Sequence, residues 1–436
     1  HNAPHLAQSL AFITPGYRAW EAPFYGLGLK IYEALAGSAS LGPTRWLNRE
    51  QTLQGLPGVR AEGLRGGVQY WDGQFDDARL ALSLARSAAS QGALLLNYCP
   101  VDRLLHERGK VVGVHWSDAR GSGAQGILRA RCVVNATGVW VDAIRRMDDQ
   151  GQGRAPGSLV MPSQGVHIVV DRAFMSGDRA LLVPRTRDGR VLFAVPWLGH
   201  LILGTTDTPR PDHPREPLPF EHEIDFILTE AGRVLDRGPT RADIRSIWVG
   251  LRPLVRPDHA EQATQRLSRE HTLLISPAGL VTVTGGKWTT YRAMAEDVLD
   301  RCGQAAFFDH LAPCGTRDFP LVGAPRRGHA STSLTEAPGL HLYGSEGEFV
   351  QALPGANHML GLGLSEAMVR FAARFEYACT IEDVLARRHR MLFLDATLAY
   401  LTAPRVAEIL YNETGKDPQV DSFQVLARQY GARVPS

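Results

Sequence analysis

The chain has 436 residues, of which 44% are hydrophobic and 21% charged, and its formal net charge is +2 at pH 7. This length predicts two or three domains, and the composition is that of an ordinary globular protein. The small net charge excludes a global field that would attract nucleic acid, so we expect no nucleic-acid partner. The 5 cysteines are odd in number and form no C-x-x-C pair, which argues against a disulfide framework and against a metal site.

The first 90 residues predict three helices around one strand. Residues 24–35 are apolar at helical spacing, and Asn48 followed by Gln51 is typical of a capped helix start. Residues 66–73 should form a short strand and turn. Residues 77–90 carry apolar side chains at mostly helical intervals and predict a further helix.

The middle of the chain is rich in β-branched residues and predicts a succession of strands. The expected strands are residues 93–98, 111–116, 128–135, 166–170, 181–184, 191–195 and 201–204. A helix over residues 222–235 follows. A strand over residues 280–284 then runs into a helix over residues 289–301.

The C-terminal part of the chain, from Ser365 onward, is predicted to be helical. One helical face is formed by Met368, Phe371, Ala372 and Phe375. Thr380 followed three positions later by Asp383 resembles a capping box, and we expect it to open the next helix.

One segment matches the glycine fingerprint of dinucleotide-binding proteins, Gly-Ser-Gly-Ala-Gln-Gly over residues 121–126. The fingerprint works only between a strand and a helix, because the pyrophosphate of the dinucleotide must meet the N-terminus of that helix. Here a second strand follows the glycines. We therefore interpret residues 121–126 as a hairpin loop and not as a cofactor site.

Two other turns have backbone suited to a bulky ligand. Residues 133–140 pass from a β-branched run through Asn-Ala-Thr-Gly into a helix, and glycine there allows close backbone approach; an ordinary strand-to-helix turn fits equally well. At residues 284–290 a strand ends at two glycines and a helix begins with two threonines. The free N–H groups of that helix start can stabilise an electron-rich ligand group. The alternative is a plain helix start with a solvated Lys287.

Two arginines and one histidine complete the candidates. Arg252 lies within an apolar run and Arg269 precedes another, and Arg suits bidentate phosphate recognition. In so Arg-rich a chain, a single Arg is more often a surface charge. His167 lies on a predicted strand between apolar residues and is either structural or an active-site proton carrier. Residues 204–208 close a nearby strand and form a turn or part of the same site.

Several segments occur in a characteristic order. They are Asp-Asp-Ala-Arg-Leu (76–80), Asn-Ala-Thr-Gly (135–138), Gln-Gly-Val-His-Ile-Val (164–169), Gly-Thr-Thr-Asp-Thr (204–208), Gly-Leu-Arg-Pro-Leu (250–254), Ser-Arg-Glu-His-Thr (268–272) and Gly-Gly-Lys-Trp-Thr-Thr-Tyr-Arg (285–292). In this order, and with the C-terminal run 376–388, they closely resemble aerobic, FAD-dependent glycerol-3-phosphate dehydrogenases over nearly the whole chain.

The resemblance implies an α/β (α+β) fold in three parts. These are a Rossmann-like FAD-binding domain (residues 71–155 and 270–305), an antiparallel-sheet cap domain for the substrate (1–70 and 156–269) and a C-terminal helical domain (306–436). The family begins with a strand, a G-x-G-x-x-G loop and a helix. We expect roughly the first 70 residues of that pattern to be absent from this sequence, judged against the length of a βαβ unit.

The resemblance also assigns site residues. Arg252, Arg269 and Lys287 match the family's cations around substrate and phosphate. The residues that match the two turns at the FAD are Ala136, Thr137, Gly138, Gly286, Trp288, Thr289 and Thr290. The implied reaction oxidises sn-glycerol 3-phosphate to dihydroxyacetone phosphate, with a hydride passing to flavin N5. Arg252 and Lys287 would assist this step, and His167 is the candidate base.

The family's electron acceptor is a membrane quinone, which implies a membrane surface as partner. No run of about 18 apolar residues is present, so we predict no transmembrane helix. The resemblance implies peripheral attachment to the cytoplasmic face of a bacterial inner membrane, or a cytoplasmic protein, and it also allows a homodimer. Two other readings stay open. One is a related flavin amine or amino-acid oxidase, although three cations exceed what a carboxylate substrate needs. The other is a catalytically incomplete chain, such as an interaction module.

Overall fold

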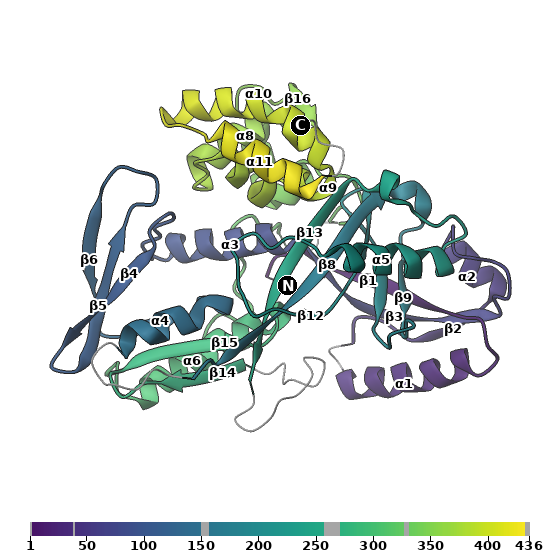
Figure 1. Ribbon diagram of the computed structural model, residues 1–436, viewed down its shortest axis with the longest axis horizontal. Helices are drawn as coiled ribbons and strands as arrows, with labels where there is room; N and C mark the ends of the chain where they lie inside the picture. The colour runs from purple at the N-terminus through teal and green to yellow at the C-terminus, as the bar shows by residue number, and fades with distance from the viewer. Residues whose placement is uncertain (1, 38–39, 150–156, 257–270, 327–330, 432–436) are drawn as a thin grey trace.

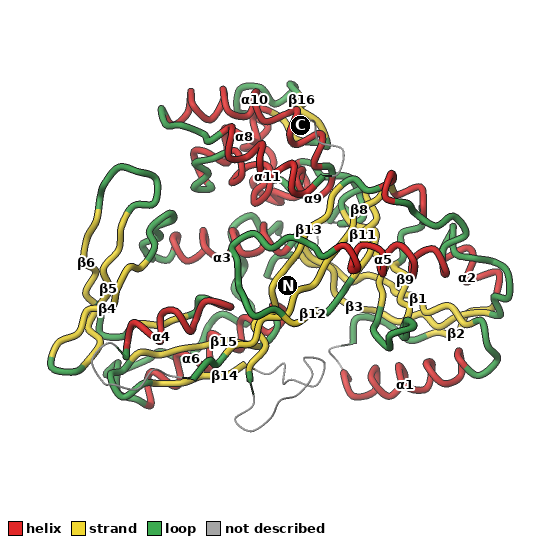
Figure 2. The backbone as a smooth tube through the Cα atoms, viewed as in Figure 1, coloured by secondary structure: helices red, strands yellow, loops and turns green. Residues whose placement is uncertain are grey.

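A computed structural model describes residues 2–37, 40–149, 157–256, 271–326 and 331–431. A large sheet crosses the middle of the molecule, a smaller sheet lies beside it, and helices of the C-terminal region gather at one end (Figure 1). Strands and helices alternate along most of the chain, whereas the last quarter is almost entirely helical (Figure 2). The predicted mixed α/β class is thereby confirmed.

The large sheet has nine strands, most of them antiparallel to their neighbours. They are β1 (Ala7–Gly16), β2 (Arg45–Asn48), β3 (Gly66–Phe75), β8 (Val160–Asp171), β9 (Ala180–Val183), β10 (Leu192–Trp197), β11 (His200–Gly204), β12 (Thr208–Pro209) and β13 (Ser246–Val255). Their order is β12-β8-β11-β10-β9-β1-β3-β2, and β13 pairs with β8 along its whole length.

The two faces of this sheet differ because side chains alternate along each strand. On one face, residues such as Ile168, Leu192 and Leu203 pack in a buried core with α5 (Glu221–Val234) and α2 (Arg49–Gly55). The first helix, α1 (Glu21–Ala36), packs on β1, β2 and β3. The opposite face carries His167 and Phe193, and part of it borders a cavity.

The smaller sheet contains the two glycine turns. It consists of β14 (His271–Ile275), β15 (Leu280–Gly285) and β7 (Val133–Asn135), with β15 and β7 parallel. Helical segments η2 (Gly138–Trp140) and α4 (Val141–Asp148) follow β7, and η6 (Trp288–Thr290) and α6 (Tyr291–Gln304) follow β15. The helix predicted to begin at Thr289 is thus confirmed, with a 3-10 turn at its start.

A separate antiparallel sheet of β4 (Val101–Glu107), β5 (Lys110–Ser117) and β6 (Gln125–Arg129) stands apart at one side of the molecule (Figure 1). The glycine-rich residues 121–124 connect β5 and β6, which pair antiparallel. This confirms that the literal G-x-G-x-x-G match is a hairpin loop.

Two strand predictions in this region were wrong. Residues 128–135 are not one strand: residues up to Arg129 pair with β5, whereas residues from Val133 pair with β15 in another sheet. Residues 93–98 form no strand either. Leu94 and Leu96 are exposed and the segment pairs with no strand in the described part of the chain. An unpaired extended segment has no ladder of hydrogen bonds to hold it.

The C-terminal region forms a helical body with its own core around the fully buried Phe371. Its elements are η7 (Leu340–Glu346), α7 (Gly347–Gln351), β16 (Met359–Gly361), β17 (Leu364–Ser365), α8 (Glu366–Phe375), η8 (Asp383–Arg388), α9 (Met391–Leu394), α10 (Ala396–Thr414) and α11 (Val420–Tyr430). The capping box is confirmed, since the amide N–H of Asp383 donates to the Thr380 hydroxyl at 3.1 Å. Phe375 lies on the predicted face, with its ring centroid 5.2 Å from that of Phe371, and is partly exposed there.

Three elements complete the description: α3 (Asp77–Ser90) and the 3-10 turns η3 (Arg172–Phe174) and η4 (Arg241–Asp243). Both α3 and the capped start of α2, where Gln51 and Asn48 exchange hydrogen bonds, are as predicted. Within the described ranges, no helix combines the length and the apolar character needed to cross a bilayer. The three-domain division stays a prediction.

Candidate active site

The two glycine turns lie side by side at one edge of the small sheet. Because β7 and β15 are parallel neighbours, both turns leave the carboxyl ends of adjacent strands, where ligands bind in open α/β sheets. The Thr284 hydroxyl donates to the Gly138 carbonyl at 3.3 Å and ties one turn to the other. The Thr137 hydroxyl donates to the Asn135 side chain at 2.7 Å. A ligand placed at this edge would meet both turns.

The backbone at these turns requires glycine. Gly138, Gly285 and Gly286 have φ angles of 62°, 75° and 71°, a region in which a Cβ is strained. A Cβ at Gly286 would also lie 2.6 Å from the Met294 sulfur, so the Met294 side chain would have to move. The turns therefore present bare backbone, and the N-terminus of a 14-residue helix follows the second turn.

Trp288 lies between the second turn and the large sheet. Its ring centroid is 6.4 Å from that of Phe75 and 5.0 Å from that of Tyr291. A cavity of about 450 Å³ opens beside these rings and is also bordered by Thr289 and Gln74. The indole Nε1 is buried and has no hydrogen-bond partner among the described residues. Since buried N–H groups are nearly always paired, this donor suits an acceptor atom of a ligand.

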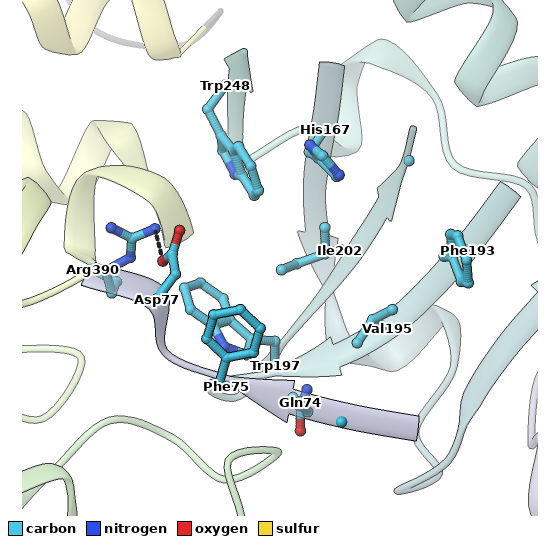
Figure 3. A pocket seen from close by; sticks show the side chains of 12 residues that line it. Gln74, Phe75, Asp77, His167, Phe193, Val195, Trp197, Ile202, Trp248 and Arg390 are labelled. Carbon is cyan, nitrogen blue, oxygen red and sulfur yellow. Dashed lines mark ion pairs between the residues drawn. The ribbon is translucent and has the colours of Figure 1, made fainter. Parts of the chain in front are cut away.

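A second cavity, of about 390 Å³, lies on the open face of the large sheet (Figure 3). Its apolar floor comes from alternate residues of β10 and β11, among them Val195 and Ile202. His167 and Trp248 border it on one side, and Asp77 and Arg390, 3.2 Å apart, border it on another. The two cavities share Gly73, Gln74 and Phe75 in their linings. They therefore adjoin along the end of β3.

His167 is held between a tryptophan and a glycine. Its ring stacks on Trp248 with centroids 4.2 Å apart, and a Cβ at Gly204 would lie 2.5 Å from its Cδ2. Burial, with a smaller contribution from the Arg252 charge, lowers the pKa of His167 to about 3, while Asp77 acts in the opposite direction. The imidazole is therefore neutral near pH 7. A substrate anion bound beside it would raise this pKa and make His167 a better proton acceptor.

Arg252 reaches the same sheet face from β13. Its guanidinium donates to the Thr206 carbonyl at 3.1 Å and to the Thr205 hydroxyl at 3.2 Å, and it lies 3.4 Å from the Asp207 carboxylate. It can lie flat against β8 because residue 165 is glycine: a Cβ at Gly165 would be only 2.4 Å from the guanidinium. The orientation of the Arg252 side chain is thus set by its contacts with the turn after β11 and by the absence of a side chain at Gly165.

The structure brings some of the predicted residues together. His167 and Arg252 share one face of the large sheet, and β13 contacts both β15 and η2 of the small sheet. Lys287 is exposed in the turn after β15. Ala136 and Thr137 at the first turn are likewise exposed, and so are Thr289 and Thr290 at the second. Arg269 lies outside the described residues. The roles assigned to all these residues stay predictions.

The sequence reasoning missed Trp248 and Arg390. A signal existed for Trp248, because residues 248, 250 and 252 of one strand must face the same side of the sheet. None existed for Arg390, which enters the cavity wall from the C-terminal region. Its guanidinium lies over the rings of Phe393 and Trp197, at 4.1 and 5.5 Å from the centroids. Only the tertiary structure brings it to the sheet.

Helix α3 holds the C-terminal region against the cavity. Arg79 on α3 pairs with Glu376 at 2.9 Å, and both side chains are almost fully buried. The same guanidinium donates to the carbonyls of Leu342 at 3.2 Å and Arg388 at 3.0 Å. These bonds fix the chain just before Arg390, so the position of Arg390 at the cavity depends on them.

Comparisons with known proteins agree with this arrangement. A model of the family "FAD dependent oxidoreductase" matches residues 19–298, and the chain belongs to this family. A second model, "C-terminal domain of alpha-glycerophosphate oxidase", matches residues 314–421. The resemblance drawn from the ordered motifs is therefore confirmed.

Similar proteins with a more specific name than this broad family are glycerol-3-phosphate dehydrogenases. The chain is 36% identical over 440 residues to the "Probable glycerol-3-phosphate dehydrogenase, mitochondrial" of Caenorhabditis elegans, covering 95% of this chain and 59% of that protein. It is 33% identical over 483 residues to the "Glycerol-3-phosphate dehydrogenase, mitochondrial" of Saccharomyces cerevisiae, covering 95% and 74%. The chain thus spans only about three fifths of the length of the worm relative.

A solved structure shows the same fold over nearly the whole chain. It is the glycerol-3-phosphate dehydrogenase of Bacillus halodurans complexed with FAD, with a TM-score of 0.78 and 28% sequence identity. The match covers 98% of this chain and 83% of that chain.

Proposed function

We propose that this chain carries the catalytic face of an enzyme that oxidises sn-glycerol 3-phosphate to dihydroxyacetone phosphate with FAD and passes the electrons to a quinone. One observation carries the proposal: Arg252 and a neutral His167 share one sheet face beside the glycine turns. A phosphorylated alcohol needs both groups, because its phosphate requires a forked cation and its hydroxyl requires a proton acceptor.

The residues of the two turns fit a flavin. Gly138, Gly285 and Gly286 present backbone without side chains, and the buried N–H of Trp288 has no partner in the described part of the chain. The N-terminus of α6 carries partial positive charge suited to the electron-rich edge of an isoalloxazine ring. We assign these residues, with Ala136, Thr137, Thr289 and Thr290, to holding the cofactor. FAD, when bound, supplies the acceptor for the hydride.

The chain's own residues bind the substrate and handle its proton. Arg252 and Lys287 bind the phosphate, and their charge stabilises the alkoxide-like oxygen that develops at the secondary alcohol. His167 accepts the hydroxyl proton. The bound phosphate dianion offsets the Arg252 charge, which is one of the two causes that hold the pKa of His167 low.

The same proposal includes peripheral attachment to a membrane, because a quinone acceptor resides in the lipid phase. We place the chain at the cytoplasmic face of a bacterial inner membrane. The worm and yeast relatives are both named as mitochondrial proteins.

The test is reduction of the flavin by candidate substrates. The full chain, supplied with FAD and held without oxygen, should lose its visible flavin absorbance when sn-glycerol 3-phosphate is added. Glycine and proline, substrates with a carboxylate and no phosphate, should leave the absorbance unchanged. Bleaching by an amino acid but not by sn-glycerol 3-phosphate would overturn the proposal in favour of an amino-acid oxidase.

A further inference from the structure

Glu223 on α5 is a buried carboxylate on the core face of the large sheet. Only 1% of the residue is exposed, and an acidic side chain is almost never buried so completely unless it is paired. Helix α5 lies beside β8 (Figure 1). Because side chains alternate along a strand, Arg252 and His167 lie on the opposite face from α5. The partners of Glu223 show how it can act across the sheet.

Four hydrogen bonds hold the Glu223 carboxylate. The hydroxyls of Thr206 and Thr208 donate to one oxygen at 2.9 and 2.6 Å. The Gln164 amide and the backbone N–H of Phe220 donate to the other oxygen at 2.6 and 2.9 Å. The bond from Phe220 caps the start of α5. The other three bonds join α5 to β8 and to the turn after β11, so helix capping alone does not explain this residue.

Thr206 connects Glu223 to Arg252. Its hydroxyl donates to Glu223 and accepts a hydrogen bond from the backbone N–H of Val166 at 3.0 Å. Its carbonyl accepts a hydrogen bond from the Arg252 guanidinium at 3.1 Å. Thr206 is itself only 1% exposed. One buried residue therefore contacts both charged groups, and a shift of Glu223 would be passed to Arg252 through it.

The turn between β11 and β12 depends on these bonds because it has little regular structure of its own. The strand that ends it, β12, has only two residues. Glu223 binds the hydroxyls at positions 206 and 208, one on either side of Asp207. The Asp207 carboxylate lies 3.4 Å from the Arg252 guanidinium. Glu223 thus holds in place both the carbonyl and the carboxylate that face Arg252.

A glutamine at position 223 could not take over this role, although it has the same shape. All four partners donate to the carboxylate, and a glutamine would turn an NH₂ group toward two of them. The Thr206 hydroxyl cannot reverse its direction without loss, because it already accepts a hydrogen bond from Val166. Donors that face each other in a buried site force the groups apart. We therefore expect Glu223→Gln to displace the turn.

We propose that Glu223 is a positioning residue for substrate recognition: through Thr206 and Thr208 it holds the turn that directs Arg252 toward the substrate phosphate. Glu223 lies on the core face of the sheet, so it acts through the turn and not by contact with the substrate. The proposal rests on the proposed function, which supplies the phosphate that Arg252 binds. The chain of hydrogen bonds from α5 to Arg252 is independent of that function.

Anaerobic flavin reduction by the full chain with FAD tests the proposal, with sn-glycerol 3-phosphate and glycerol as substrates. In Glu223→Gln the preference for the phosphorylated substrate should fall by about tenfold to a hundredfold, because a displacement of about 1 Å is enough for such a loss. Most of the change should lie in the substrate concentration for half-maximal reduction. The affinity for dihydroxyacetone phosphate, measured by calorimetry without turnover, should fall in parallel. Thr206→Val removes the connecting hydroxyl, keeps the carbonyl and should lower the preference as well.

Glu230→Gln is the matched control. Glu230 lies on the same helix, is 6% exposed and pairs with Arg233 at 2.8 Å. Its replacement should leave the preference as in the wild type, whatever its effect on the melting temperature. The double variant Arg252→Met/Glu223→Gln should show the same preference as Arg252→Met alone, because Glu223 acts only through Arg252.

The possible outcomes separate the proposal from the proposed function. A wild-type preference in either Glu223→Gln or Thr206→Val, when the variant folds and Arg252→Met loses the preference, would overturn the role of Glu223 alone. So would a double variant with a clearly lower preference than Arg252→Met. A wild-type preference in Arg252→Met would refute both the role of Glu223 and the assignment of Arg252 to the phosphate. If Glu223→Gln does not fold, Thr206→Val decides the question.

Discussion

At the scale of single residues, the candidate site depends on the absence of side chains as much as on their presence. Gly204 leaves room for the His167 ring, and Gly165 leaves room for the Arg252 guanidinium. The two polar groups can share one sheet face only because the positions beside them carry no Cβ. This makes Gly165 a sharper test of the site than removal of a charge, because its replacement alters geometry alone.

Gly165→Ala should lower kcat/KM for sn-glycerol 3-phosphate by about tenfold to a hundredfold, with most of the change in KM, because the new Cβ displaces Arg252 from its position. Steady-state kinetics with a soluble dye acceptor measures this. Gly250→Ala is the matched control: Gly250 pairs with Gly165 across the strands, and a Cβ there meets nothing within 4 Å. Equal kinetics for both variants would show that the position of Arg252 does not matter.

At the scale of elements, α3 joins the C-terminal region to the rest of the molecule through the buried pair of Arg79 and Glu376. The Arg79 guanidinium also lies 4.1 Å from the centroid of the Tyr343 ring and donates to two backbone carbonyls. Charges buried in this way destabilise a fold strongly when one partner is removed, because the other is left without compensation.

Glu376→Gln should therefore lower the free energy of unfolding by about 3–5 kcal/mol, measured by urea denaturation. The double variant Arg79→Met/Glu376→Leu should recover most of the loss, since it leaves no unpaired charge. Glu107→Gln breaks the exposed pair with Arg129 and should produce no measurable change. A Glu376→Gln variant as stable as the Glu107→Gln variant would show that the Arg79–Glu376 pair does not stabilise the contact between α3 and the C-terminal region.

Some of the helices and strands could be predicted from the sequence and others could not. The helix over residues 77–90 and the strand–glycine–helix unit around Gly285 were predictable because periodicity, caps and turn residues are local signals. The strand predicted over residues 93–98 was wrong, because a strand needs a neighbouring strand to pair with. A local apolar run does not reveal whether such a neighbour exists. His167 and Arg252 were predicted as site residues from the sequence, and their roles stay predictions. Their shared face depends on the register of β8 with β13, and the place of Arg390 depends on packing across more than 200 residues of chain.

At the scale of the whole molecule, buried histidines link stability to pH. Burial, with a smaller contribution from the charge of Arg79, lowers the pKa of His5 and of His389 to about 4. In the unfolded chain a histidine has a pKa of about 6.5. Between these two values the unfolded chain binds protons that the folded chain does not, so the stability is complete above pH 6.5 and falls as the pH falls toward 4.

The free energy of unfolding should thus be lower at pH 5 than at pH 7, by about 2 kcal/mol for each of these two histidines. Denaturant titrations at the two pH values measure the difference. His389→Gln should reduce the difference by the contribution of one histidine, whatever its effect on stability at pH 7. His222→Gln, at an exposed position, should leave the difference as in the wild type. An unchanged difference in the His389→Gln variant would refute the assignment.

In the proposed reaction, Arg252 recognises the phosphate of sn-glycerol 3-phosphate beside His167. The most direct measurement is the anaerobic rate of flavin reduction by sn-glycerol 3-phosphate and by glycerol, in the wild type and in Arg252→Met. The wild type should prefer the phosphorylated substrate by about a thousandfold or more, and Arg252→Met should lose most of that preference, because its rate with sn-glycerol 3-phosphate should fall much further than its rate with glycerol. A preference that survives the loss of Arg252 would contradict the account.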